Sequence, residues 1–172
     1  GYLKSNTVVG TKMTNLGIRK ALAEQDINFI EANVGDRYVM EELIQNHAVL
    51  GGEGSGHIIC LNKSTSGDAI IAALQVLEVI AKSGKSLHTL KNNMTKFPQI
   101  LINVKTNTQQ DLINNKVINE AIKSVEKKLS NSGRVLIRKS GTESLIRVMV
   151  ESDNLDLARE SANYLAEIIK TK

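Results

Sequence analysis

The sequence is poor in cysteine, proline and aromatic residues, and each shortage narrows what the protein can be. Its 172 residues include one cysteine, one proline, three tyrosines, two phenylalanines and no tryptophan. A lone cysteine excludes an intramolecular disulfide framework, which favours a reducing, cytoplasmic setting. With aromatic residues at 3%, few rings are present to stack on bases, so nucleic-acid binding is disfavoured. Aliphatic side chains must therefore supply most of the core.

Long hydrophobic runs are also missing. The longest apolar segment, residues 69–81, is interrupted by Gln75 and Glu78 and is shorter than the roughly 18 residues of a membrane span. We therefore expect no membrane partner and interpret the segment as a buried helix. Cys60 lies in the apolar run 57–61, which predicts a small buried hydrophobic residue instead of a reactive thiol.

Charge is nearly balanced. The 22 lysines and arginines exceed the 18 aspartates and glutamates by four, giving a net charge of +4. Such a mild basic excess suits an anionic small ligand as well as a larger polyanion.

Strand-like and helix-like segments alternate over the first part of the chain. This alternation predicts an α/β fold, with a mixed βαβ-type sheet covered on both faces. Gly84 is expected to end the last long helix of this part. The expected strands are residues 7–11, 27–32, 47–50 and 57–61, and the expected helices are residues 15–24, 38–45 and 68–82.

The polar stretch 83–98 holds the only proline, and we place a domain boundary near Thr95, giving domains of residues 1–94 and 95–172. The second domain is predicted to be a small α+β domain, with an antiparallel sheet and flanking helices. Its expected strands are residues 99–105, 134–138 and 145–150, and its first expected helix is residues 112–129 with Asp111 as N-cap. A final amphipathic helix is indicated by an apolar stripe of Leu155, Ala158, Ala162, Leu165 and Ile169.

The loop after the second of these strands is a candidate phosphate site. Ser140 and Thr142 supply hydroxyl donors, and Gly141 allows the backbone to curl so that successive N–H groups point inward. Arg138 and Arg147 flank the loop, and each presents a planar fork of donors. An ordinary hairpin turn remains the alternative, because serine, glycine and threonine are common in turns.

A glycine-rich loop at residues 51–57 is a candidate sugar site. Glu53 can accept hydrogen bonds from hydroxyl groups, while Ser55 and His57 can donate or accept them. The alternative is a flexible connection between two strands. The loop is not a dinucleotide-binding fingerprint, because it leads into a strand-like run and not into a helix.

A third candidate is the segment Gly35, Asp36 and Arg37, between a predicted strand and a predicted helix. Asp36 can equally well cap that helix, with Arg37 in solvent.

Several long segments, in order along the chain, resemble the phosphoglucosamine mutase branch of the α-D-phosphohexomutase superfamily. They are residues 7–17, 34–39, 51–59 and 134–143, followed by Ile146, Arg147 and Val148. In that family four domains surround a central cleft, and this chain resembles the third and fourth, cut from a longer protein. The family usually has a larger residue where Gly54 stands and often a proline where Ser144 stands.

The resemblance implies roles for the three candidate loops. It places Glu53, Ser55 and His57 in the sugar-binding loop of the third domain. A neighbouring loop facing the cleft would hold Gly35, Asp36 and Arg37. The phosphate-binding loop of the fourth domain would hold Arg138, Ser140, Gly141, Thr142 and Arg147.

The reaction implied is the interconversion of glucosamine 6-phosphate and glucosamine 1-phosphate, which feeds bacterial cell-wall precursors. A phosphoserine of the first domain exchanges phosphate with the sugar through a bisphosphate, and aspartates of the second domain hold Mg²⁺. The aspartates of this chain never cluster, and none of its serines lies in a segment like the phosphoserine loop. We therefore expect no catalytic or metal-binding residue here, and no turnover without the missing N-terminal domains.

Three alternatives remain at this stage. The chain can belong to a phosphomannomutase or phosphoglucomutase of the same superfamily. It can be a phosphosugar-binding module without catalysis. It can also be a two-domain structural protein whose loops are only turns, although that leaves the arginines around Ser140 unexplained.

Overall fold

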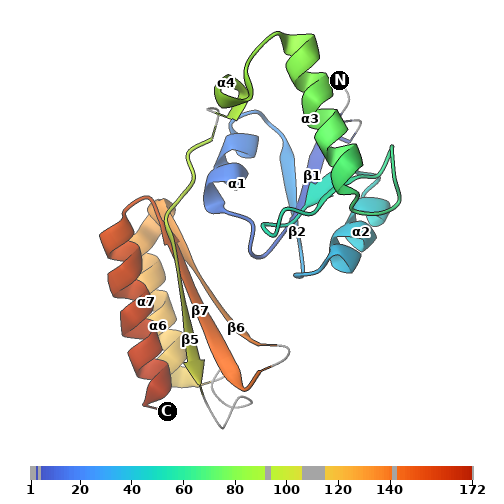
Figure 1. The fold of residues 1–172 in the computed structure, drawn as a ribbon. Helices are drawn as coiled ribbons and strands as arrows, with labels where there is room; N and C mark the ends of the chain where they lie inside the picture. The colour runs from blue at the N-terminus through green and yellow to red at the C-terminus, as the bar shows by residue number, and fades with distance from the viewer. Residues whose placement is uncertain (1–2, 4, 92–93, 106–114, 141–142, 172) are drawn as a thin grey trace. The chain divides into compact units, whose positions relative to one another are not determined.

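The chain divides into two compact units, Gly1–Lys96 and Phe97–Lys172. The computed structural model describes residues 3, 5–91, 94–105, 115–140 and 143–171 (Figure 1). The first unit holds β1 (Thr7–Thr11), α1 (Leu16–Ala23), β2 (Asn28–Ala32), α2 (Asp36–Gln45), β3 (Leu50–Gly52), β4 (Ile58–Cys60), α3 (Ala69–Ser83) and α4 (Leu87–Lys91). The second holds β5 (Gln99–Lys105), α6 (Lys116–Leu129), a 3₁₀ turn (Ser130–Ser132), β6 (Gly133–Lys139), β7 (Leu145–Ser152) and α7 (Leu155–Lys170). No helix among the described residues is long and apolar enough to cross a membrane.

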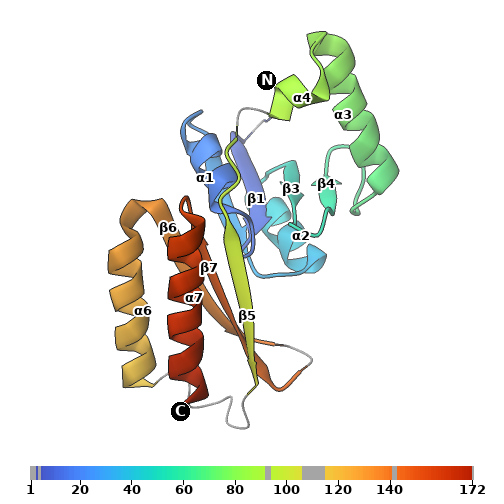
Figure 2. The ribbon, with the colours of Figure 1, turned by 60° about the vertical axis from the view of Figure 1, so that its left-hand side comes forward.

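The first unit contains the predicted mixed sheet. Its strand order is β2-β1-β3-β4, with β1 parallel to β2 and β3, and β3 antiparallel to β4. Helix α1 connects β1 to β2, and α2 connects β2 back to β3 on the other side of β1. Since both connections are right-handed, the two helices cover opposite faces of the sheet, and Figure 2 shows them on either side of β1. Under α2, the side chains of Val9, Val39, Leu43 and Ile59 form a core in which each is at most 1% exposed.

Local signals in the sequence set the ends of the long helices in this unit. The carboxylate of Asp68 accepts hydrogen bonds from the N–H groups of Ile70 and Ile71 at the start of α3. Gly84 ends the helix with a φ of 65°, a left-handed conformation that glycine adopts without steric cost. The sequence did not indicate α4, which lies in the polar stretch after Gly84.

Helix α3 is not buried, although its apolar composition predicted that it would be. None of its residues is buried, and the side chains of Ile70, Leu74 and Leu77 are 73%, 55% and 57% exposed. With 3.6 residues per turn, these three share one stripe, and Gln75, Glu78 and Lys82 occupy the other side. The polar side lines a cavity together with β3 and β4. Composition counts apolar residues but does not say which side of a helix meets the sheet.

The second unit is the predicted antiparallel sheet with helices. Its order is β5-β7-β6, and α6 and α7 cover one face (Figure 2). Alternation along the strands sends one set of side chains into the core under these helices, including Val104, Val148 and Val150. The N-cap of α6 is Asn115, whose side chain accepts from the N–H of Val117, while the predicted cap Asp111 lies outside the described residues.

The apolar stripe predicted for α7 is wrong at its first position. Leu155 is 45% exposed, whereas Ala158, Ala162, Leu165 and Ile169 are buried as expected. Leu155 is the first residue of the helix, directly after the capping Asn154, so it lies at the edge of the contact with the sheet.

The opposite face of this sheet carries charged pairs. Arg134 on β6 stands directly across from Glu151 on β7, and its Nε lies 2.5 Å from the Glu151 carboxylate. The Glu151 side chain is fully buried, and the Arg134 side chain is 17% exposed. A buried carboxylate is stable only when a cation and hydrogen bonds replace the water it has lost.

We expect Arg134→Met to lower the free energy of unfolding by about 3 kcal/mol, because it leaves the Glu151 carboxylate buried without this cation. The matched control is Arg159→Met, which removes an exposed ion pair with Asp156 on α7 and should cost less than about 0.5 kcal/mol. Urea unfolding of the two variants measures the difference. Equal losses would contradict the importance assigned to the buried pair.

Candidate functional site

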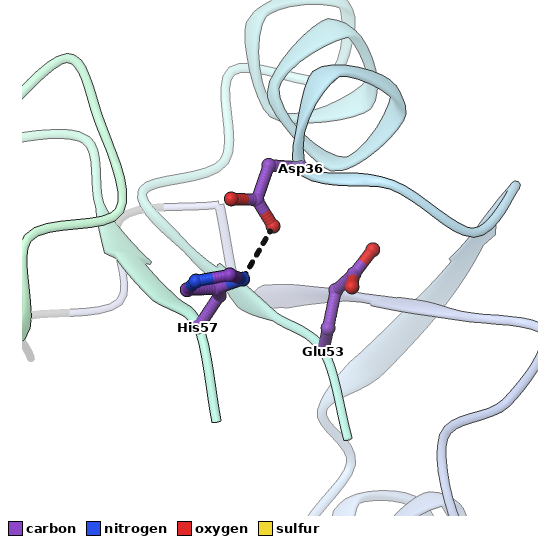
Figure 3. A group of neighbouring side chains, drawn as sticks. All are labelled: Asp36, Glu53 and His57. Carbon is purple, nitrogen blue, oxygen red and sulfur yellow. Dashed lines mark ion pairs between the residues drawn. The ribbon is translucent and has the colours of Figure 1, made fainter. Parts of the chain in front are cut away.

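Three side chains from two segments of the first unit converge at one place (Figure 3). Asp36 is the first residue of α2, while Glu53 and His57 stand at the two ends of the loop between β3 and β4. This loop closes on itself, since the N–H of Glu53 donates to the carbonyl of His57 at 2.9 Å and Gly56 turns with a φ of 100°. A tight loop therefore holds Glu53 and His57 side by side, facing the start of α2.

Backbone and side-chain donors orient the Glu53 carboxylate. One oxygen accepts a hydrogen bond from the N–H of Gly35, and the other accepts from the hydroxyl of Ser55 at 3.3 Å. Gly35 has a φ of 132°, a conformation open to glycine and strained for other residues. His57 Nδ1 lies 3.2 Å from Asp36 Oδ1, as the dashed line in Figure 3 marks. Gly35, Asp36, Glu53, Ser55 and His57 thus form one connected polar cluster.

This cluster is rich in acceptors. Asp36, Glu53 and His57 each offer one oxygen or nitrogen atom within 4.8 Å of the others. Asp36 and Glu53 are half-buried, and His57 is exposed, so a ligand can reach all three. The arrangement can accept hydrogen bonds from several hydroxyl groups or from an ammonium group.

The same three residues are the one group of potential metal ligands among the described parts of the chain. Two carboxylates and an imidazole form a mixed donor set, typical of transition metals or zinc. Mg²⁺ prefers an octahedral shell of oxygen ligands, usually carboxylates, phosphates and water. The cluster therefore does not fit a resident Mg²⁺.

Arg37 does not join the cluster in this structure. Its side chain is 84% exposed, and its Nε lies 2.8 Å from a carboxylate oxygen of Glu41, one turn further along α2. The hydrogen bond with Glu41 raises the pKa of the Arg37 guanidinium above its ordinary value. Arg37 therefore stays a separate cation on the surface of α2.

In the second unit, Arg138 and Arg147 stand directly opposite each other on β6 and β7. Like charges at directly opposed positions destabilise a sheet. The Nε atoms of both arginines are buried and have no hydrogen-bond partner among the described residues. Burial, and secondly repulsion by Arg147, lowers the pKa of the Arg138 guanidinium below its ordinary value. The strands thus hold two cations together with part of their donor capacity unused.

Ser140 and Glu143 complete the described surroundings of Arg147. Its Nη2 lies 3.5 Å from the hydroxyl of Ser140, which is 7% exposed, and 3.6 Å from the carboxylate of Glu143. The hydrogen bond from the Ser140 N–H to the Leu145 carbonyl closes the hairpin beneath them. Gly141 and Thr142, the other two predicted phosphate ligands, lie outside the described residues.

Sequence reasoning missed two of these contacts. The loop motif gave no role to Glu143, although its place four residues before Arg147 allows the two to meet. The pairing of Asp36 with His57 joins residues 21 positions apart, and only the fold brings them together. The one available signal was that Asp36 begins a predicted helix and His57 directly precedes a strand of the same unit.

Comparison with known proteins places the chain in a family. Residues 1–97 match the family model "Phosphoglucomutase/phosphomannomutase, alpha/beta/alpha domain III", and residues 101–168 match "Phosphoglucomutase/phosphomannomutase, C-terminal domain". The chain is 58% identical over 170 residues to the phosphoglucosamine mutase of Ruthia magnifica subsp. Calyptogena magnifica. It is 48% identical over 165 residues to that of Hydrogenovibrio crunogenus.

These relatives are much longer proteins. The matches cover 99% and 96% of this chain but only 38% and 37% of the relatives' length. Among solved structures, Aspergillus fumigatus N-acetylphosphoglucosamine mutase has the same fold, with a TM-score of 0.84 at 18% identity over 98% of this chain and 40% of that one. An N-acetylglucosamine-phosphate mutase in a product complex superimposes with a TM-score of 0.81 at 22% identity, over 95% of this chain and 38% of that one. From the two matched models and these relatives, the chain belongs to the phosphoglucomutase/phosphomannomutase family, and it corresponds to domain III and the C-terminal domain.

Proposed function

We propose that this chain forms the substrate-binding half of a phosphoglucosamine mutase. The complete enzyme interconverts glucosamine 6-phosphate and glucosamine 1-phosphate through a phosphoserine and a bisphosphate intermediate. The names of the relatives at 58% and 48% identity support this activity. Because the chain spans 38% of the first relative's length, the activity is assigned to the longer protein and ligand binding to this part.

The observation that carries the proposal is the opposed pair of Arg138 and Arg147. Two cations at directly paired positions repel each other unless an anion lies between them. A phosphate dianion offers enough acceptor oxygens for the unused Nε donors of both arginines and for the Ser140 hydroxyl. Arginine forks also suit a tetrahedral phosphate better than a point charge does, because each can donate two parallel hydrogen bonds.

The acceptor-rich cluster of the first unit binds the sugar in this proposal. The oxygens of Asp36 and Glu53 accept hydrogen bonds from sugar hydroxyls, and the ring of His57 adds a further polar contact. Two neighbouring carboxylates also favour a cationic group over a neutral one. This feature supports an amino sugar, whose ammonium group is charged, over the glucose or mannose phosphates of the alternative members of the family.

In the catalytic cycle, these residues position the substrate. The arginine pair holds the phosphate that is not reacting, and the cluster keeps the sugar hydroxyls in place. Fixing a reactant in this way lowers the barrier through orientation and through matching fixed charges. Mg²⁺ would neutralise charge on the transferring phosphate, but no described group of residues here fits it. We propose that the metal ligands and the phosphoserine lie in the preceding part of the longer protein.

We expect saturable NMR shifts at Ser140 and Arg147 when this chain is titrated with glucosamine 6-phosphate. Arg147→Ala should raise the Kd at least about tenfold, because a hydrogen bond to a charged group contributes about 1.5–3 kcal/mol. Arg159→Ala, an exposed arginine on α7, should leave the Kd unchanged. Equal affinity in the wild type and the Arg147→Ala variant would overturn the phosphate site.

We expect the cluster to favour the amino sugar. Glu53→Gln removes a negative charge while keeping the size of the side chain, and it should weaken glucosamine 6-phosphate more than glucose 6-phosphate. Glu42→Gln, on α2 with its carboxylate hydrogen-bonded to Asn46, is the matched control and should affect neither ligand. Equal effects of Glu53→Gln on both sugars would show that the carboxylate does not recognise the ammonium group.

We expect this chain alone to show no conversion of glucosamine 6-phosphate to glucosamine 1-phosphate in a coupled assay, because the described residues offer no metal site suited to Mg²⁺. The full-length protein at equal molar concentration is the positive control. Turnover by the purified 172-residue chain at a comparable rate would refute the proposal that the phosphoserine and the metal ligands lie outside this chain.

A further inference from the structure

Helix α3 turns an apolar surface toward solvent. The exposed side chains of this stripe are Ile70, Leu74 and Leu77, which are between 55% and 73% exposed. We call these three residues the α3 apolar face. Neighbouring apolar residues on a single helix form a contiguous patch, and large patches of this kind in soluble proteins mark interaction sites.

The first unit does not use this face for its own packing. The side of α3 that lines a cavity with Leu50 and Cys60 carries Gln75, Glu78, Val79 and Lys82. The helix thus has its charged residues on the side of its own sheet, while the stripe of Ile70, Leu74 and Leu77 is directed elsewhere. Burial of the outward stripe must come from another part of the protein or from another molecule.

The apolar character of the patch continues beside the helix. Leu50, Ile58, Ala72, Leu87 and Leu90 line a groove along α3 and α4 together with Val76 and Val79. Ile58 and Leu87 are themselves 40% and 54% exposed. The patch is therefore broader than one helix, and it includes the outer strand β4 of the sheet.

We infer that the α3 apolar face packs permanently against the domains that precede domain III in the longer protein. The relatives extend well beyond the matched region, and this chain corresponds to their C-terminal part. The family model that matches residues 1–97 describes them as domain III, so earlier domains belong to the same polypeptide. Domains of the same polypeptide are covalently linked and do not have to find each other by diffusion. An apolar face between them can therefore stay covered at all times.

The chemistry of the patch favours a permanent interface over a transient one. Permanent interfaces resemble a divided hydrophobic core, and charged residues are depleted at their centres. The two charged residues within α3, Glu78 and Lys82, both lie away from the outward stripe and pair with each other. The patch therefore offers no charge for steering or for selecting a soluble partner.

Cysteine labelling tests this inference in both the 172-residue chain and the full-length protein. Leu74→Cys and Leu77→Cys place a thiol on the α3 apolar face, and Val117→Cys places one on α6 at 45% exposure as a control. Cys60 gives a low background, because it is 8% exposed and burial raises the pKa of its thiol. Maleimide should label positions 74 and 77 at least about tenfold more slowly in the full-length protein than in this chain, and position 117 equally in both.

Each other outcome overturns the inference. Equal labelling at positions 74 and 77 in both proteins would show that the face stays in solvent. Protection in the 172-residue chain that rises with its concentration, together with a larger mass by light scattering, would assign the face to a second copy. Protection in this chain that does not depend on concentration would assign it to another part of the same chain.

Hydrogen exchange of the unsubstituted proteins provides a second readout that needs no variant to fold. The amides of α3 should exchange more slowly in the full-length protein than in this chain, while those of α6 should exchange at the same rate. Equal exchange of the α3 amides in the two proteins would also contradict a permanent interface.

Discussion

The opposed cations of Arg138 and Arg147 depend on the register of one pair of strands. Alternate residues of β6 and β7 point into the core under α6 and α7, and the buried side chains of Val148 and Val150 fix which residues these are. The remaining positions must face the other side, so the two arginines meet across the ladder whether or not a ligand is bound. A slip of one residue in either strand would send its arginine toward the apolar core. Burial of aliphatic side chains on one face therefore maintains a charged site on the other.

On this face of the sheet, two pairs of opposed residues hold partly buried charges in different ways. At Arg134 and Glu151 the opposed residues carry opposite charges, so the pair is satisfied within the protein. At Arg138 and Arg147 the charges are alike, and burial, with repulsion by Arg147 as a second cause, lowers the pKa of Arg138. Arg134 thus faces a carboxylate, whereas Arg138 faces a second arginine, and the Nε donors of Arg138 and Arg147 have no partner among the described residues. The first pair stabilises the fold, and in our proposal the second binds phosphate.

Features set by neighbouring residues were predictable from the sequence. The strand of residues 99–105 and the stop at Gly84 each depend on a few adjacent residues, and the structure confirms both. Features set by distant contacts were not predictable from pattern alone. The apolar composition of α3 suggested burial, but the orientation of a helix depends on what it packs against. Arg37 lies beside Asp36 in sequence, yet the first turns of α2 direct it to Glu41, while Asp36 meets His57 from another loop. Resemblance to a family identified the loops, and the structure added how their side chains are held.

The candidate site of the first unit is negatively charged, and that of the second unit is positively charged. Carboxylates of Asp36 and Glu53 collect in the first unit, and guanidinium groups of Arg138 and Arg147 collect in the second. An amino sugar phosphate carries an ammonium group and a phosphate, and in our proposal each group of residues matches one of these charges. Neither group needs the ligand in order to form, because a glycine-dependent loop holds one and a strand register holds the other. In our proposal these preformed charges bind the reactant, and the chemical step belongs to the rest of the longer protein, of which this chain covers 38% of the first relative's length.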